Sequence, residues 1–243
     1  MTGFAEPVLS IIIPAYNEQT TLKWLVDYVN SVSYPVPHEV IIIDDASTDR
    51  TYEDSLALQR GAVSTATRIT VLHNPVNRGK GYSVRRGIGE AKGSVIVVQD
   101  ADTEYDPHEL PRLIQPVLSG EEQVVFGSRF MSGGYPKGMG LPNYIANVSL
   151  TWLTNLLYGL KLTDMETCYK IFRADIIKKM DLKCERFSFE PEVTALLTKS
   201  GVRIKEMPIS YRGRGIKQGK KIRAIDFFKA LTVLFMNRFG RDA

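Results

Sequence analysis

Three carboxylates at alternate positions, Asp100, Asp102 and Glu104, directly follow the apolar run 95–98. In an extended backbone, side chains two residues apart point to the same side, which would gather the three acids. Neighbouring anions repel one another unless a cation lies among them. Oxygen ligands favour a hard ion, and Mg²⁺ usually takes one or two carboxylates together with substrate phosphates. We therefore expect Asp100, Asp102 and Glu104 to bind Mg²⁺ or Mn²⁺; the alternative is a solvated turn whose aspartates cap the next helix.

The acids follow one of several short apolar runs that alternate with helix-like segments. The runs cover 8–13, 40–43, 69–72, 95–98 and 124–126, with helical spacing at 20–32, 51–60, 77–91 and 106–118. This alternation predicts an α/β fold with a largely parallel central sheet flanked by helices. The first strand is expected to stop at Pro14, which cannot donate a hydrogen bond to the sheet.

Polar groups follow each predicted strand. They are Tyr16 and Glu18, Asp44 and Asp45, 77–80, 100–104, and Arg129. Because ligands of open α/β sheets bind beyond the carboxyl ends of the strands, these groups are expected to converge on one binding edge.

The second half of the chain, 131–243, differs in character from the first, 1–130, and we expect both halves to form one domain. A Gly- and Pro-rich loop at 131–143 leads to a helix at 144–160 that carries a broad apolar stripe. Further segments are a mixed stretch at 164–173, a helix at 190–200, an edge strand at 202–210, a basic glycine-rich stretch at 212–221 and an amphipathic helix at 224–239.

The net charge of +4 is too modest to indicate nucleic-acid binding, and no aromatic stacking pattern accompanies the basic residues. No apolar run approaches the roughly 20 residues that span a bilayer. The two cysteines lack metal-ligand spacing and are expected to be buried thiols in a reducing compartment. We therefore expect a cytoplasmic protein, at most peripheral on the cytoplasmic face of a membrane. Helix 224–239 either lies on an anionic bilayer or packs in the core.

Several motifs resemble the family two glycosyltransferases of the GT-A fold. They are Ile-Ile-Ile-Pro-Ala-Tyr-Asn-Glu at 11–18, Ile-Ile-Asp-Asp-Ala-Ser-Thr-Asp at 42–49, Asn-Arg-Gly-Lys-Gly at 77–81 and Gln-Asp-Ala-Asp at 99–102. Within that family, 127–129 and 164–170 resemble the polyprenyl (dolichyl) phosphate sugar synthases. The resemblance implies metal-dependent transfer of a hexose, with inversion, from a UDP- or GDP-sugar to a polyprenyl or dolichyl phosphate.

The resemblance also implies residue roles. Nucleotide binding falls to Pro14, Tyr16, Glu18, Asp45, Lys80 and Asp100, with Asp45 on a ring nitrogen of the base and Lys80 on the diphosphate. Asp44 is instead a candidate for a buried acid at the strand end. Asp102 is the main metal ligand, Asp100 a second ligand or a ribose contact, and Glu104 a third ligand. The acceptor phosphate is expected at Arg129, Lys170 and Arg214, while Asn143 and Asn147 occupy positions where mannose synthases hold this phosphate with Arg and Ser.

The need for a general base depends on the acceptor. A phosphate monoester has a second pKa of about 6 and is already a nucleophilic dianion at neutral pH. A saccharide or other hydroxyl acceptor would need a carboxylate, for which Asp164 and Glu166 are favoured over Glu190. The predicted catalytic residues are thus Asp102, Arg129, Asp164 and Glu166. A non-catalytic nucleotide-binding regulator is a further alternative, whereas a nucleotidyltransferase would need a Gly-rich signature after the first strand.

Overall fold

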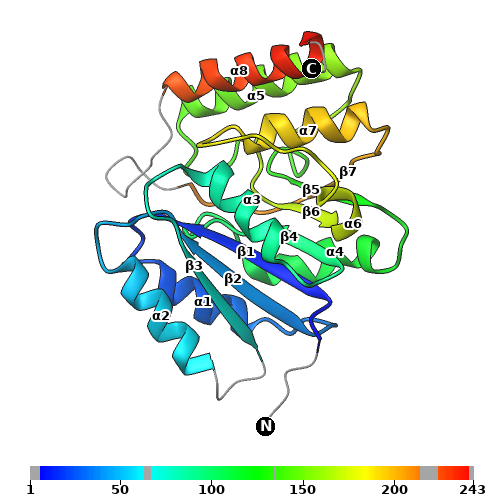
Figure 1. Cartoon of the computed structure of the whole chain (residues 1–243). Helices are drawn as coiled ribbons and strands as arrows, with labels where there is room; N and C mark the ends of the chain where they lie inside the picture. The colour runs from blue at the N-terminus through cyan, green and yellow to red at the C-terminus, as the bar shows by residue number, and fades with distance from the viewer. Residues whose placement is uncertain (1–5, 63–66, 134, 214–223, 241–243) are drawn as a thin grey trace.

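The computed structural model describes residues 6–62, 67–133, 135–213 and 224–240, and it contains one seven-stranded sheet of order β3-β2-β1-β4-β6-β5-β7 (Figure 1). The strands are β1 Leu9–Ala15, β2 His38–Asp44, β3 Arg68–His73, β4 Val95–Val98, β5 Val124–Ser128, β6 Lys170–Arg173 and β7 Lys205–Pro208. Strand β6 is antiparallel to both of its neighbours, and the other pairings are parallel. The prediction of a largely parallel α/β sheet is therefore confirmed, and β7 lies at an edge as expected.

Helices cover the sheet and form a separate layer above it. They are α1 Leu22–Ser31, α2 Thr51–Gly61, α3 Lys80–Glu90, α4 Leu110–Leu118, α5 Leu141–Tyr158, α6 Ala174–Ile177, α7 Phe189–Lys199 and α8 Ala224–Phe239, with a short 3₁₀ turn η2 Pro107–Glu109 before α4. Helix α3 crosses the face of the sheet that is turned to the viewer in Figure 1, while α7 and then α5 and α8 stack beyond one end of the sheet. Within the described residues, no helix combines the length and the apolar character needed to cross a bilayer.

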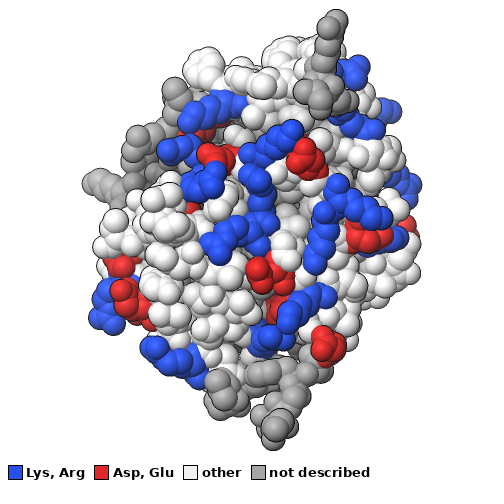
Figure 2. All heavy atoms as spheres, viewed as in Figure 1, with Lys and Arg blue, Asp and Glu red and all other residues white. Residues whose placement is uncertain are grey.

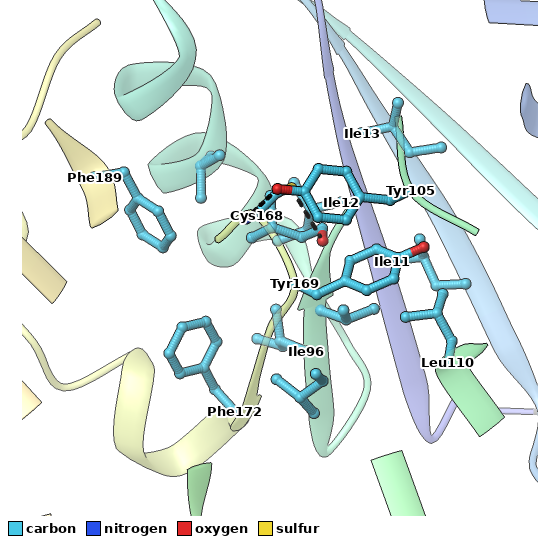
Figure 3. Packing of buried hydrophobic residues seen from close by; sticks show 14 of the residues in the cluster. Ile11, Ile12, Ile13, Ile96, Tyr105, Leu110, Cys168, Tyr169, Phe172 and Phe189 are labelled. Carbon is cyan, nitrogen blue, oxygen red and sulfur yellow. Dashed lines mark hydrogen bonds between the residues drawn. The ribbon is translucent and has the colours of Figure 1, made fainter. Parts of the chain in front are cut away.

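Aromatic side chains of the second half pack against the strands of the first half (Figure 3). The rings of Tyr105 and Tyr169 lie 5.0 Å apart between their centroids, and Phe172 meets Phe189 edge-on at 6.4 Å. The backbone N–H of Cys168 donates to the Tyr105 hydroxyl at 3.2 Å. These contacts fix the loop that precedes β6 against the end of β4, where the sequence places the acids.

Strand β1 continues through Pro14 to Ala15, so the prediction that it ends at Pro14 is wrong. The carbonyl of Ala15 accepts from Asp45 N–H on the β2 side, whereas Ile12 accepts from Gln99 N–H on the β4 side. Pro14, two residues after Ile12, faces the β4 side, where β4 has already ended at Val98. Its missing N–H therefore removes no hydrogen bond from the sheet.

The sequence pattern did not reveal β6, which lies inside the stretch predicted to have mixed chemistry. Only four residues form it, and its first residue is Lys170, which is completely buried. Burial of a lysine requires that its ammonium be hydrogen-bonded, and Nζ donates to the carbonyls of Met165 at 2.7 Å and Thr167 at 2.8 Å. Strand β6 joins β4 to β5 and so brings both halves of the chain into one sheet.

Candidate active site

The three acids after β4 lie in different surroundings, because residues 101–105 form bends rather than an extended strand. Asp100 Oδ1 lies 2.7 Å from Lys80 Nζ, and Asp102 Oδ1 accepts the backbone N–H of Glu104 at 3.0 Å. Glu104 Oε2 accepts the Tyr211 hydroxyl at 2.6 Å. The predicted extended geometry is therefore wrong, and the described chain groups no three His, Cys, Asp or Glu side chains as a ready metal site. The carboxylates of Asp100 and Asp102 still suit a hard ion that takes its other ligands from a substrate.

Lys80 begins α3 and links β4 to the second half of the chain. Its Nζ contacts Asp100 Oδ1 at 2.7 Å and Glu190 Oε1 at 2.8 Å. Burial by itself lowers the pKa of Lys80, but the negative charges of Asp100 and Glu190 outweigh it and hold this pKa well above its usual value. A permanent cation thus lies at a helix N-terminus, where backbone N–H groups also favour anions.

Asp45 holds the turn that leads into α3. Its Oδ1 accepts from Asn74 Nδ2 at 2.6 Å and from Arg78 N–H at 3.0 Å, and its Oδ2 accepts from Gly79 N–H at 2.6 Å. Gly79 has φ of 88°, and a Cβ there would lie 2.3 Å from the Cα of Arg186, so only glycine fits. Asp45 thus supports the loop from beneath, and its contact with the nucleobase stays a prediction.

Asp44 is fully buried, as the alternative interpretation of this residue expected. Its Oδ2 contacts His73 Nδ1 at 2.8 Å, whereas its Oδ1 is buried without a hydrogen-bond partner in the described part of the chain. An unpaired carboxylate oxygen at a strand end is an acceptor that a ligand N–H would satisfy.

The loop after β1 is fastened to the loop after β2. Glu18 is buried, its N–H donates to Thr51 Oγ1 at 2.8 Å, and its Oε2 accepts from Thr21 Oγ1 at 2.7 Å. The N–H of Asn17 donates to Ser47 Oγ at 3.0 Å. Pro14 and Tyr16, the other predicted nucleotide contacts on this loop, are half-buried beside them. The ends of β1, β2 and β4 therefore form one edge, as the sequence predicted.

Arg129 and Asp164 form a buried ion pair at the end of β5. Arg129 Nε lies 2.7 Å from Asp164 Oδ2, and Nη2 lies 2.7 Å from Oδ1 and 2.9 Å from the amide oxygen of Asn147 on α5. Burial lowers the pKa of Arg129, but Asp164 raises it more, so this pKa stands well above its usual value. Its Nη1 makes no hydrogen bond within the described residues.

Glu166 is an acid whose surroundings include Glu190, Lys170, Arg129 and Asp164. Its Oε1 is buried without a partner in the described part of the chain. Burial raises its pKa from 4.5 to about 8, and nearby Glu190 adds to the rise, while Lys170 and Arg129 oppose it. Glu190 also contacts Lys80, so Glu166 is within electrostatic reach of both the Lys80 and the Arg129 clusters.

Residues 10–181, more than half of the chain, match Glycosyl transferase family 2. The chain belongs to glycosyl transferase family 2.

Relatives of this glycosyltransferase include enzymes named for lipid-phosphate acceptors. It is 25% identical to the UDP-N-acetylglucosamine–dolichyl-phosphate N-acetylglucosaminyltransferase of Methanococcus voltae, over 98% of both chains. It is 31% identical to the dodecaprenyl-phosphate galacturonate synthase of Rhizobium johnstonii, over 98% of this chain and 70% of that protein. The predicted similarity to polyprenyl-phosphate sugar transferases is confirmed.

A solved structure shows the same fold. Glucosyl-3-phosphoglycerate synthase from Mycobacterium tuberculosis, in complex with Mn²⁺, UDP and phosphoglyceric acid, superposes with a TM-score of 0.72 at 18% identity, covering 98% of this chain and 80% of that one. The GT-A fold predicted for the chain is confirmed.

Lys170 and Arg214 were predicted to bind the acceptor phosphate together with Arg129. The ammonium of Lys170 is buried, donates to two backbone carbonyls and lies 4.1 Å from the centroid of the Phe126 ring, so it supports the 164–168 loop instead of facing a ligand. Arg214 lies outside the described residues. The basic stretch begins over the site, since Arg212 N–H donates to the Glu104 carbonyl at 3.0 Å and Gly213 N–H donates to the Lys137 carbonyl at 2.9 Å.

Glu190 is a site residue whose role the sequence did not reveal. Its place in the first turn of α7 stabilises the helix dipole, and its carboxylate also contacts Lys80. Glu192, two residues later, accepts the backbone N–H of Cys184 at 2.8 Å. An acid in the first turn of a helix looks the same in sequence whether it stabilises the helix dipole or pairs with a distant lysine. The sequence signal for the second role is that Lys80, if buried, needs an acidic partner.

Basic residues also surround the site on the surface. Figure 2 shows Lys and Arg side chains gathered across the middle of the face that α3 crosses in Figure 1, with acidic side chains between them.

Proposed function

We propose that this glycosyltransferase transfers a hexose, with inversion, from a UDP- or GDP-sugar to a polyprenyl or dolichyl phosphate. One observation carries the proposal: two buried cations lie beyond the strand ends, Lys80 paired with Asp100 and Glu190 after β4 and Arg129 paired with Asp164 after β5. A reaction between a nucleotide diphosphate and a phosphate acceptor needs a cation for each anion. The names of the Methanococcus voltae and Rhizobium johnstonii relatives support a lipid-phosphate acceptor.

On the donor side, Pro14, Tyr16 and Glu18 contact the base and ribose, and Lys80 contacts the diphosphate. Asp102 with Asp100, and Glu104 as a third contact, would hold Mg²⁺ or Mn²⁺, which when bound neutralises the charge that develops on the leaving nucleoside diphosphate. Oxygen donors at the β4 end fit such an ion. The crystal structure of the mycobacterial enzyme contains both UDP and Mn²⁺, which supports this assignment.

On the acceptor side, Arg129 orients the phosphate through Nη1, while Asp164 keeps the guanidinium fixed. The phosphate dianion attacks the anomeric carbon opposite the leaving group, which inverts the configuration. No side chain has to remove a proton, so positioning and charge stabilisation are the chain's contributions. Arg214, outside the described residues, is proposed as a second phosphate contact.

The unpaired Oε1 of Glu166 favours a second candidate, transfer to a saccharide or other hydroxyl. Asp164 is held by Arg129, so Glu166 would be the base in that reaction. The two candidates differ in one variant: Glu166→Gln keeps most turnover with a phosphate acceptor and abolishes it with a hydroxyl acceptor.

The experiment uses purified protein with Mg²⁺ or Mn²⁺, a panel of UDP- and GDP-sugars, and matched short-chain polyprenyl phosphate and polyprenol. We expect a glycosyl-phosphate product, detected by mass spectrometry, with the phosphate acceptor alone, and loss of product on adding EDTA. Product from polyprenol or a saccharide in place of the phosphate would contradict the proposal.

The domain organisation is part of the proposal. Strands from 1–130 and from 131–243 alternate in one sheet, with β6 between β4 and β5. This arrangement supports a single domain in which the first half binds the donor and the second half binds the acceptor. The protein would then work in the cytoplasm at the face of the membrane that carries the acceptor.

A further inference from the structure

Helices α5 and α8 expose an apolar surface that no described part of the chain covers. The exposed side chains are Leu141, Ile145, Val148, Trp152 and Leu156 on α5 and Phe228, Phe235, Met236 and Phe239 on α8, together called the α5–α8 face. Trp152 is 65% exposed and Phe239 is 68% exposed. Large side chains repeated on one side of a helix normally pack in a core. The structure turns this side outward.

The two helices form one continuous surface. The middle of α5 and the start of α8 border a shallow hollow lined by Val148, Ser149, Trp152, Leu153, Phe227 and Leu231. Near the end of α5, the Tyr158 hydroxyl donates to the Leu234 carbonyl of α8 at 2.8 Å. Figure 1 shows the pair as the outermost layer, on the far side of α7 from the sheet. Contiguous exposed apolar patches of this kind mark interaction sites.

The exposed charges on the described part of these helices are all positive. None of the 18 residues of α5 is charged, although a helix facing water normally carries charges on its outer side. On the described part of α8 the exposed charged residues are Lys229 and Arg238, and the acid Asp226 is buried. In Figure 2 the upper edge, over these helices, shows white and blue side chains, and red ones lie lower.

We propose that the α5–α8 face lies on an anionic bilayer, with its apolar side chains in the interface and its cations at the lipid headgroups. Aromatic and aliphatic side chains flanked by cations match the surface of such a membrane. A second copy of the chain fits less well, because it would bring the same cations to both sides of the contact.

The face is also continuous with the acceptor side of the active site. Asn147, on the inner side of α5, accepts from Arg129 at 2.9 Å, and Val148 follows it on the outer side. One helix therefore borders both the bilayer and the cation assigned to the acceptor phosphate. The inference deepens the proposed function, on which it rests, by placing the membrane beside the phosphate site.

The chain has two tryptophans, which makes the test specific. Trp152 lies on the face, and Trp24 lies on α1 and is 50% exposed. In Trp24→Phe, vesicles of equimolar phosphatidylcholine and phosphatidylglycerol should shift Trp152 emission to the blue, and brominated lipid should quench it. In Trp152→Phe, the emission of Trp24 should not change. Unchanged Trp152 emission in protein that has sedimented with the vesicles would overturn the inference.

A second variant tests the energetics. Ile145→Ser/Trp152→Ser should weaken vesicle binding by about tenfold or more, since two large side chains no longer enter the interface. Trp24→Ser, which removes a half-exposed ring on α1, should bind as wild type does. Equal loss in both variants, or dimerisation by sedimentation without lipid that buries Trp152, would contradict a membrane partner.

Failure of this inference and of the proposed function can be told apart. In vesicle-free buffer with a short-chain polyprenyl phosphate, Ile145→Ser/Trp152→Ser should turn over like wild type, with an unchanged circular dichroism melting curve. If wild type enters vesicles through Trp152 but transfers no sugar to any polyprenyl phosphate, the proposed acceptor is wrong and the membrane surface stands. If transfer occurs without insertion, the membrane surface is wrong.

Discussion

The donor side and the acceptor side of this glycosyltransferase are built differently. At the ends of β1 and β2, Asp45 and Glu18 are hydrogen-bonded by the protein's own N–H and hydroxyl groups, so the loops are fixed before any ligand arrives. On the acceptor side, α5 and α8 expose large apolar side chains that no described part of the chain covers. The donor side is preorganised for a small, constant ligand, whereas the acceptor side is completed by a large, partly apolar one.

The largest expected effect comes from Asp102→Asn on the donor side. Turnover should fall by about 10²–10³-fold or more, because one charge that stabilises the leaving diphosphate is lost. The amide oxygen still accepts the Glu104 N–H, so the thermal melting temperature should change little. Initial rates with the preferred nucleotide sugar provide the measurement. Asp106→Asn, on the same loop, is the control and should retain activity; equal losses would refute a special role for Asp102.

Arg129→Met tests the acceptor side through stability. Removing the cation leaves Asp164 buried and unpaired, which should cost about 3–5 kcal/mol in the free energy of unfolding. Adding Asp164→Leu should restore most of that stability but none of the turnover, since Arg129 is assigned to the acceptor phosphate. Urea denaturation and sugar-transfer rates check both statements. A double variant that regains turnover would show that the pair is structural only.

Glu166 makes the acceptor side sensitive to pH. Because folding raises its pKa from 4.5 to about 8, the folded state favours the protonated form, and this stabilisation is complete below pH 4.5 and lost as the pH rises through 8. As the pH rises from 5 to 8, the free energy of unfolding of Glu166→Gln should therefore increase by about 1–2 kcal/mol relative to that of wild type. This is less than the full pKa shift would give, because solvent relaxation around the carboxylate reduces the cost of ionisation. Urea midpoints at the two pH values test this. A difference that is constant with pH would contradict the assignment.

The smallest expected effect sharpens the comparison. Asn74→Ala removes one of three hydrogen bonds to Asp45 and should cost about 1–2 kcal/mol of stability while raising KM for the nucleotide sugar alone. Asn155→Ala removes two hydrogen bonds with Leu162 on the other side and should leave that KM unchanged. Chemical denaturation measures the stability of both variants, and steady-state kinetics measure their KM for the nucleotide sugar. Equal changes in KM would mean that the donor side and the acceptor side are not independent.

The sequence predicted the donor side well because its signals are local. A buried strand followed directly by Asp44 and Asp45, or by Asp100, places the acids at the sheet edge without knowledge of the tertiary structure. The bends after β4 were missed, since alternate acids look the same in a strand and in a turn.

The acceptor side was predicted less well because its structure depends on contacts between distant segments. Lys170 resembles a phosphate ligand in sequence, and only the carbonyls of Met165 and Thr167 explain its burial. Glu190, in the second half of the chain, forms an ion pair with Lys80 in the first half. The apolar repeat of α5 has the same period whether that side meets a core or a membrane, so its exposure could not be read from spacing.

The most direct test of the donor site is a crystal structure with Mn²⁺ and the nucleoside diphosphate of the preferred donor. The account predicts an anomalous manganese peak bound by Asp102, with the diphosphate between the ion and Lys80 and the base beside Tyr16. A manganese peak elsewhere, or a diphosphate that contacts neither Asp102 nor Lys80, would contradict it.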